Sequence, residues 1–105
     1  MNYKQKRWTD LRERILKRDK YLCKECLRYG KKTDAYLVHH IFPASQVKEY
    51  RYLKENLISL CNTCHNELHD RNSDELTDKG QQLLDRHREM IEAAWQRVST
   101  YLKVR

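Results

Sequence analysis

The segment Asn56-Leu-Ile-Ser-Leu-Cys-Asn-Thr-Cys-His-Asn66 decides the fold, because a C-x-x-C pair and a histidine directly follow a short apolar run. Cys61 and Cys64 form this pair, and Cys23 and Cys26 form another pair upstream. Four thiolates complete a tetrahedral Zn²⁺ shell and leave no position for a substrate. The spacing therefore predicts a structural zinc site that ties the two pairs together.

Two other uses of paired cysteines stay open. A redox C-x-x-C pair belongs in a βαβ setting, which this sequence does not resemble, and an iron–sulfur cluster is a third alternative. Residues 1–18 have no apolar core of a signal peptide, and no run approaches the roughly 18 apolar residues of a membrane span. We therefore expect a cytoplasmic protein, whose reducing surroundings favour metal thiolates over disulfides.

Positive charge gathers in the first third of the chain. The formal net charge is +7, and residues 1–32 hold 12 Lys and Arg against 4 Asp and Glu. Trp8, Leu11 and Ile15 recur there at helical spacing, which predicts an amphipathic helix over residues 6–18. A basic face of this kind suits a polyanion, although it can also be solvated surface alone. The candidate DNA-binding residues on this face are Arg7, Arg12, Arg14, Lys17 and Arg18.

The rest of the chain combines short apolar runs with helical patterns. Residues 35–41 are β-branched and aromatic and predict a strand, and residues 56–60 predict a second strand antiparallel to it. Residues 44–55 have no clear period, so we expect a loop between the strands. A helix is expected from an N-cap at Thr63 to about residue 71, and a long amphipathic helix over residues 77–103.

Four of the five histidines lie in the middle of the sequence. His65 and His69 are four residues apart, so one face of the predicted helix presents both rings. His39 and His40 are adjacent in the predicted strand and face opposite ways. One of them can therefore join the helical pair as a metal ligand while the other stays free beside it, which is a hydrolytic arrangement. His87, in the last helix, is expected to be structural or exposed.

Val38-His-His-Ile-Phe-Pro43, the segment 56–66 and His69 together resemble the ββα-metal signature of HNH endonucleases, over about residues 23–71. The whole chain also looks like the small stand-alone enzymes of phages and prophages. The resemblance implies a small α+β fold, a ββα-metal (HNH) core with a four-cysteine zinc site and flanking helices. It implies a single nuclease domain over residues 1–105.

Residue by residue, the family pattern implies roles for the central histidines. His40 matches the general base that activates water, Asn56 the brace behind that base, and His65 a metal ligand. His39 stands where many members have an acidic ligand, which together with His69 resembles the DNase domains of colicins. The implied ligands of the catalytic divalent metal are thus His39, His65 and His69. Imidazole ligands suit Zn²⁺, Ni²⁺, Co²⁺ or Mn²⁺ better than the hard ion Mg²⁺.

The function implied is metal-dependent hydrolysis of DNA phosphodiester bonds, with nicking as one form of it. The histidine base takes a proton from water, and the metal stabilises the phosphate transition state. DNA is the expected partner, and proteins of a phage terminase or packaging machine are further candidates. We expect a monomer, or a homodimer through the helix of residues 77–103, in the cytoplasm of a bacterial or phage-infected cell.

Two other functions stay open at this point. One is a zinc-stapled module that binds nucleic acid without cutting it. The histidines argue against this function, because structural zinc needs only the four cysteines. The other is an accessory protein of phage DNA packaging, in which nicking serves a larger complex and the long C-terminal helix is a docking face.

Overall fold

The computed structural model describes residues 5–70 and 75–104 and has a small α+β fold. In the described part of the chain, no helix is both long and apolar enough to cross a membrane. In chain order the elements are α1 (Lys6–Arg18), α2 (Lys24–Arg28), β1 (Leu37–His40), the 3₁₀ helices η1 (Lys48–Tyr50) and η2 (Lys54–Asn56), β2 (Leu57–Leu60), α3 (Asn62–Leu68) and α4 (Asp78–Val104).

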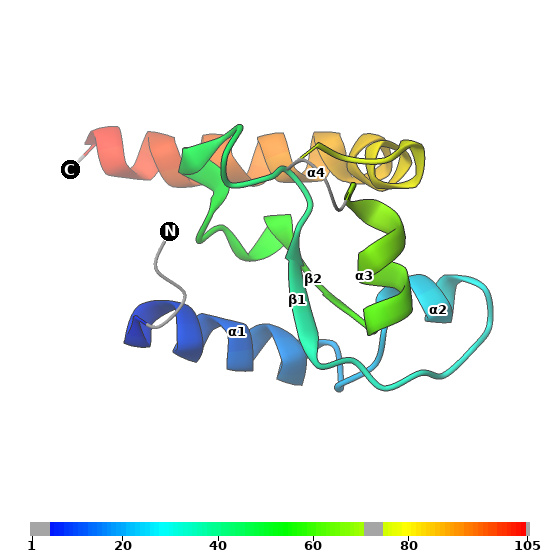
Figure 1. Cartoon of the computed structure of the whole chain (residues 1–105). Coiled ribbons are helices and arrows are strands. Elements are labelled where there is room, and N and C mark those ends of the chain that lie inside the picture. The colour runs from blue at the N-terminus through cyan, green and yellow to red at the C-terminus, as the bar shows by residue number, and fades with distance from the viewer. Residues whose placement is uncertain (1–4, 71–74, 105) are drawn as a thin grey trace.

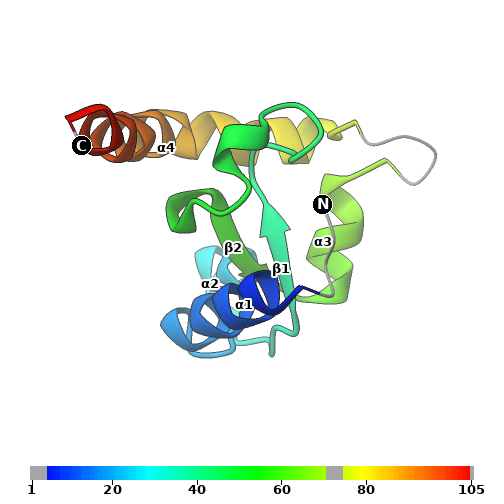
Figure 2. The same cartoon turned by 90° about the vertical axis from the view of Figure 1, so that its left-hand side faces the viewer.

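The two strands pair antiparallel at the centre of the molecule, as the sequence predicts, with α1 and α4 on opposite sides of them (Figure 1). In the register of this pair, His39 lies opposite Ile58 and His40 lies opposite Leu57. α3 follows β2 after a single residue and packs beside β1 (Figures 1 and 2). The first turn of α3 therefore starts next to the strand that carries the adjacent histidines.

Alternate residues of β2 face two different cores. Leu57 packs against Trp8 and Ile15 of α1, whereas Ile58 and Leu60 belong to the larger core. The strand period of two explains this division, and all four residues of β2 are buried as a result. The larger core also contains side chains from three helices and from the loops: Leu16, Cys23, Ala35, Ile41, Phe42, Leu53, Leu68, Leu83, Leu84, Ile91 and Ala94.

A buried carboxylate joins the end of α1 to β2. Arg18 donates to both oxygens of Asp19, at 2.8 and 2.9 Å, and the backbone N–H of Ser59 donates to Asp19 Oδ2 at 3.0 Å. Arg18 also donates to the carbonyl oxygens of Lys54 and Leu57, at 2.9 and 2.7 Å. Burial raises the pKa of Asp19, but the hydrogen bonds from Arg18 and Ser59 outweigh burial and hold that pKa below its ordinary value.

α3 and α4 approach closely because Gly80 has no side chain. A Cβ at Gly80 would clash with the carbonyl oxygen of Leu68. The backbone N–H of Thr77 donates to that same oxygen at 3.1 Å, and Thr77 Oγ1 accepts from the N–H of Gly80 at 3.2 Å. Thr77 therefore caps α4 and ties its start to the end of α3.

Three local expectations differ from the structure. The N-cap of α3 is Cys61 rather than Thr63, because the helix already begins at Asn62. α3 ends at Leu68, and the expected end near residue 71 lies outside the described residues. The predicted loop between the strands contains η1 and most of η2, which are single turns too short to give a hydrophobic period.

Replacing Asp19 with Asn should lower the free energy of unfolding by roughly 1–3 kcal/mol, because Arg18 and the Ser59 N–H then face an amide that cannot accept from all of them. The folded pKa of Asp19 lies below that of the unfolded chain, so its stabilisation is present at neutral pH and is lost as the pH falls through the acid range. Urea unfolding of both proteins at neutral and acidic pH measures this difference.

The matched control for that measurement is Asp10→Asn. Asp10 pairs with Lys6 at 2.9 Å, but both side chains are exposed, so its loss should change stability by less than about 1 kcal/mol. An equal decrease in the free energy of unfolding in the two variants would contradict a structural role for the buried carboxylate of Asp19.

Candidate active site and metal centres

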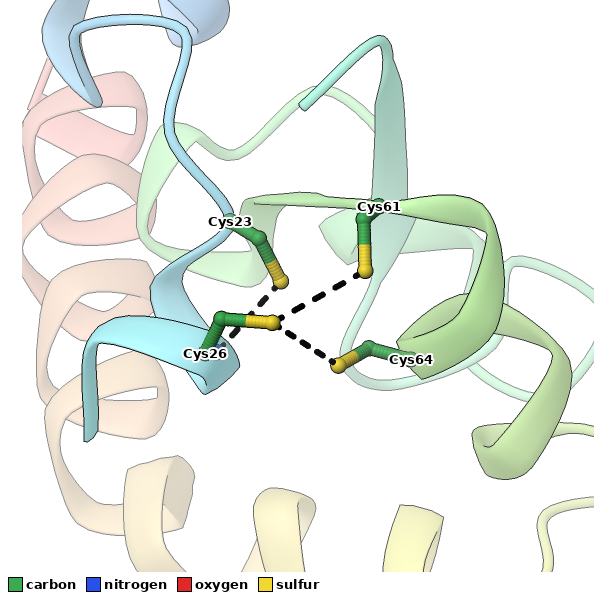
Figure 3. A group of neighbouring side chains, drawn as sticks. All are labelled: Cys23, Cys26, Cys61 and Cys64. Atoms are coloured by element: carbon green, nitrogen blue, oxygen red, sulfur yellow. Dashed lines mark hydrogen bonds between the residues drawn. The ribbon is translucent and has the colours of Figure 1, made fainter. Parts of the chain in front are cut away.

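The four cysteine sulfur atoms converge, as their spacing predicts (Figure 3). All four lie within 4.8 Å of one another, and Cys26 Sγ is 3.9 Å from Cys61 Sγ and 3.7 Å from Cys64 Sγ. A tetrahedron of thiolates around a zinc-sized ion has S···S edges of about 3.8 Å. The sulfur atoms therefore have the spacing of a four-coordinate metal site.

Two helix starts bring these sulfur atoms together. Cys23 is the N-cap of α2, where its Sγ accepts from the N–H of Cys26 at 3.5 Å, and Cys61 is the N-cap of α3. Burial, together with hydrogen bonds to the neighbouring thiols, raises the pKa of Cys64 well above its ordinary value. Four thiolates at this separation repel one another, so a shared cation is what would keep them deprotonated.

A second cluster gathers three imidazoles where β1 meets α3. One ring nitrogen from each of His39, His65 and His69 lies within 4.8 Å of the others, and His69 Nε2 is 3.1 Å from His39 Nδ1. The sequence placed His65 and His69 on one helix face, but His69 lies one residue beyond α3 in extended backbone. Its ring still reaches the cluster, with its centroid 5.5 Å from that of His65.

His39 is the ring in this cluster whose surroundings fit a ligand best. Its side chain is 2% exposed, and its Nε2 has no hydrogen-bond partner among the described residues. Burial is the main cause that holds the pKa of His39 well below its ordinary value, and charge repulsion from His69 and His65 adds to it. The ring is therefore neutral at neutral pH. Neutral imidazole is the form that binds a metal. The cluster thus fits a divalent ion with three nitrogen ligands and further positions open.

His40 contacts α1 rather than α3 and lies outside this cluster. Its Nε2 is 3.1 Å from the carbonyl oxygen of Arg51, which can only accept, so Nε2 carries the proton and Nδ1 keeps a lone pair. The indole of Trp8 stacks on the ring, with centroids 5.0 Å apart and planes 16° apart. Burial lowers the pKa of His40 and outweighs the hydrogen bond to Arg51. His40 is therefore held as a neutral ring with one nitrogen able to accept a proton.

Asn56 braces the loop that returns from His40 to β2. Its side chain is fully buried, its Oδ1 accepts from the N–H of Phe42 at 2.7 Å, and its Nδ2 donates to the carbonyl oxygens of Phe42 and Tyr50 at 3.1 and 3.3 Å. These bonds hold the backbone two residues after His40 and one residue before Arg51. The amide therefore fixes the segment whose carbonyl oxygen orients the His40 ring.

A hollow of about 450 Å³ opens onto both groups of histidines. It is lined by residues of α1, β1 and α3 and of the following loops, among them Trp8, Arg12, His39, His40, His65 and His69. A substrate phosphate seated in this hollow would meet the three-imidazole cluster, the His40 ring and a guanidinium together. The structure thus brings together the histidines that the sequence selected, and it leaves His87 apart on α4.

The five α1 cations predicted to bind DNA have different surroundings. Arg12 lines the histidine hollow, whereas Arg7 and Arg14 line a separate groove beside α4. Lys17 is exposed. Arg18 is hydrogen-bonded within the fold, to a carboxylate and two backbone carbonyls. DNA binding stays a prediction for all five. Arg12, which donates to the carbonyl oxygen of Tyr36, and Arg18 are also hydrogen-bonded within the fold.

Two contributors to the site were missed by the sequence analysis. The helical spacing indicates Trp8 only as one residue of an apolar stripe, and nothing local to it indicates that its indole stacks on His40. Arg51 contributes a backbone carbonyl oxygen, which no side-chain pattern reports. The one usable signal is that Trp8 is the only aromatic side chain on a stripe that is otherwise aliphatic within residues 6–18.

Comparison with known proteins supports one family. The model of the HNH endonuclease family matches residues 23–71. One solved structure also matches: the crystal structure, with a manganese ion, of the HNH endonuclease of the deep-sea thermophilic bacteriophage GVE2. That enzyme is 41% identical in sequence to this chain. The match covers 61% of this chain and 70% of that chain, with a TM-score of 0.60. Comparison with curated proteins gave no match.

Replacing one cysteine of the four should remove a tightly held metal ion and unfold the domain, because three thiolates leave the site incomplete and the metal ties distant segments together. We expect elemental analysis of the dialysed protein to give close to one tightly bound ion per chain, and Cys61→Ser to lose both that ion and the thermal transition seen by circular dichroism. His69→Ala is the control, since it alters only the imidazole cluster and should keep the ion and the fold. A well-folded, metal-free Cys61→Ser protein would contradict a structural metal.

Proposed function

The chain belongs to the HNH family of endonucleases, and we propose that it cuts DNA by metal-dependent hydrolysis with His40 as the general base. The observation that carries this proposal is the contrast between two adjacent histidines. His39 lies in a cluster of three imidazoles, and its buried Nε2 has no hydrogen-bond partner in the described part of the chain, whereas His40 lies outside that cluster and keeps a lone pair on Nδ1. One strand therefore supplies both a metal ligand and a base.

In this proposal His39, His65 and His69 hold the catalytic divalent ion. Such an ion would neutralise charge on the scissile phosphate and on the departing 3′ oxygen. Nitrogen ligands suit Mn²⁺, Co²⁺, Ni²⁺ or Zn²⁺, and Mg²⁺ less well. The manganese ion in the bacteriophage GVE2 structure supports a metal of this class.

His40 accepts a proton on Nδ1 from the attacking water, whose oxygen bonds to phosphorus as the P–O3′ bond breaks. The carbonyl oxygen of Arg51 supports this role because it keeps the proton on Nε2. The stacked indole of Trp8 limits rotation of the ring. Asn56 positions His40 indirectly, since it holds the loop that carries the Arg51 carbonyl.

For the four cysteines we propose zinc, in a structural role. The S···S separations of 3.7 and 3.9 Å are close to those expected around zinc, and four thiolates leave no position for substrate. The cysteine site and the histidine site are therefore assigned to different tasks, the first to folding and the second to hydrolysis.

Other proteins are candidates for contact with α4. Met90 on this helix is 49% exposed, and a second copy of the chain or a component of a DNA-packaging machine is the partner we propose for this helix. The non-cutting alternative, a zinc-stapled binding module, gives no reason for the cluster of three imidazoles.

Replacing His40 with Ala should reduce plasmid cleavage by roughly 10²–10⁴-fold while leaving metal and DNA affinity nearly intact. Replacing His39 with Ala should weaken binding of the catalytic metal, so excess metal should partly restore cleavage. Calorimetric metal titration and a nicking assay on supercoiled plasmid, run on the same preparations, separate the two effects. His87→Ala is the matched control, because its ring bonds only within α4 in the described part of the chain.

Two outcomes would overturn these assignments. If His40→Ala loses the metal while His39→Ala keeps it, the roles of the two neighbours are reversed. If both variants cut plasmid at the original rate, neither residue belongs to the active site.

Neutralising Arg12 and Lys17 should weaken binding to duplexes of any sequence, because contacts to phosphates carry no sequence information. The slope of log affinity against log salt should become shallower by roughly 0.9 for each phosphate that the protein no longer neutralises. Fluorescence anisotropy over a salt series measures both quantities for Arg12→Gln/Lys17→Gln. Lys31→Gln/Lys32→Gln removes the same charge from an exposed loop and should leave the slope unchanged. Equal slopes in all three proteins would show that this face of α1 is only solvated surface.

A further inference from the structure

We propose that a groove between α1 and α4 is a second site for the DNA backbone, separate from the histidine hollow. The inference rests on the proposed nuclease function and concerns how that enzyme holds DNA beyond the bond it cuts. The groove has a volume of about 870 Å³, against about 450 Å³ for the hollow. Its walls come from α1, from residues 48–55 and from α4. Figure 2 shows the segment with η1 and η2 between the two helices.

The groove is rich in cations that no carboxylate neutralises. Six of its lining residues are Lys or Arg, and two are Glu. Among the described residues none of these six forms an ion pair, although six other Lys and Arg side chains of the molecule do. Cations left unpaired along one groove attract a polyanion. The six are Arg7, Arg14, Lys48, Arg51, Lys54 and Arg97.

Tyr52 organises two of these guanidinium groups. The Cζ atom of Arg7 lies 3.8 Å from the centroid of the Tyr52 ring, and that of Arg51 lies 5.4 Å from it. A ring face holds a guanidinium in place but leaves its charge, and the N–H donors that phosphate oxygens accept from. The aromatic ring therefore pre-positions cations for a phosphate instead of neutralising them, as a glutamate would.

The groove lies beside the histidine hollow along α1. Trp8 and Arg12 of α1 line the hollow, whereas the groove is lined by Arg7, Leu11 and Arg14. Residues three or four apart share one face of a helix, so the hollow and the groove lie on two sides of α1. The molecule is 43 Å in its longest dimension, and one turn of duplex DNA is about 34 Å long. A duplex seated at the histidines can therefore reach the groove within about one helical turn.

Lys54→Gln/Arg97→Gln tests the groove, because both side chains are exposed and neither has been assigned to DNA binding at α1. Binding to a fluorescent 30-base-pair duplex is measured by anisotropy over a salt series, without added divalent metal so that the duplex is not cut. If each cation neutralises one phosphate, the double variant should make the salt slope shallower by about 1.8 and weaken binding by roughly 10- to 100-fold at 0.1 M salt. Lys31→Gln/Lys32→Gln is the charge-matched control and should bind as the unmodified chain does.

Two results would contradict the proposal that the groove binds the DNA backbone. One is a duplex affinity and salt slope equal to those of the control. The other is loss of binding to a poly-glutamate peptide with no loss of binding to the duplex, which would identify an acidic polypeptide as the occupant. Because the assay measures binding alone, its result can be told apart from a failure of the proposed function: a chain that cuts nothing can still pass this test, and an active nuclease can fail it.

Discussion

The convergence of four sulfur atoms within 4.8 Å is the constraint on which the rest of the structure depends. It joins the start of α2 to the start of α3, and α3 begins at the second cysteine pair. His65 follows Cys64 directly, so whatever fixes the sulfur atom also fixes where the first helical imidazole lies. A cation at the cysteines would therefore do more than add stability to a small core. It would fix the start of α3, which packs beside β1, and this packing is what brings the imidazoles of the two elements together.

The different surroundings of the two adjacent histidines follow from strand geometry and burial. The pleat turns His39 toward His65 of α3 and leaves His40 against Trp8 of α1, so identical side chains enter different surroundings. Burial keeps the pKa values of both below the ordinary range, which makes both rings neutral at neutral pH. A neutral ring is needed for each task, since a ligand must offer a lone pair and a base must have room for a proton. What distinguishes the two is therefore the neighbour of each ring, not its charge.

The sequence predicted the features that depend on short-range spacing and missed those that depend on distant contacts. The span of α1, the antiparallel strands and the approach of the cysteines all follow from local periods or from ligand chemistry. Lys17 and Arg18 show what sequence spacing cannot predict, because they are adjacent cations on one helix and their spacing does not distinguish them. Arg18 is hydrogen-bonded to backbone carbonyls 36 and 39 residues away, so its structural role exists only once β2 has packed on α1. The stack of Trp8 on His40 and the groove beside α4 have the same origin, in elements that meet only in the folded chain.

Arg51 connects the two parts of the surface that the sequence left separate. Its backbone carbonyl accepts from His40, and its guanidinium lies beside Tyr52 in the groove. Asn56 fixes the same loop through the carbonyl of Tyr50, so the peptide that orients the His40 ring is held from within the core. The orientation of His40 therefore depends on this loop and on α1, and not on the imidazole cluster. If a DNA backbone occupies the groove, its contact with the Arg51 side chain acts on a loop that is already fixed. Occupancy there would then steady the existing hydrogen bond between His40 and Arg51 without having to create one.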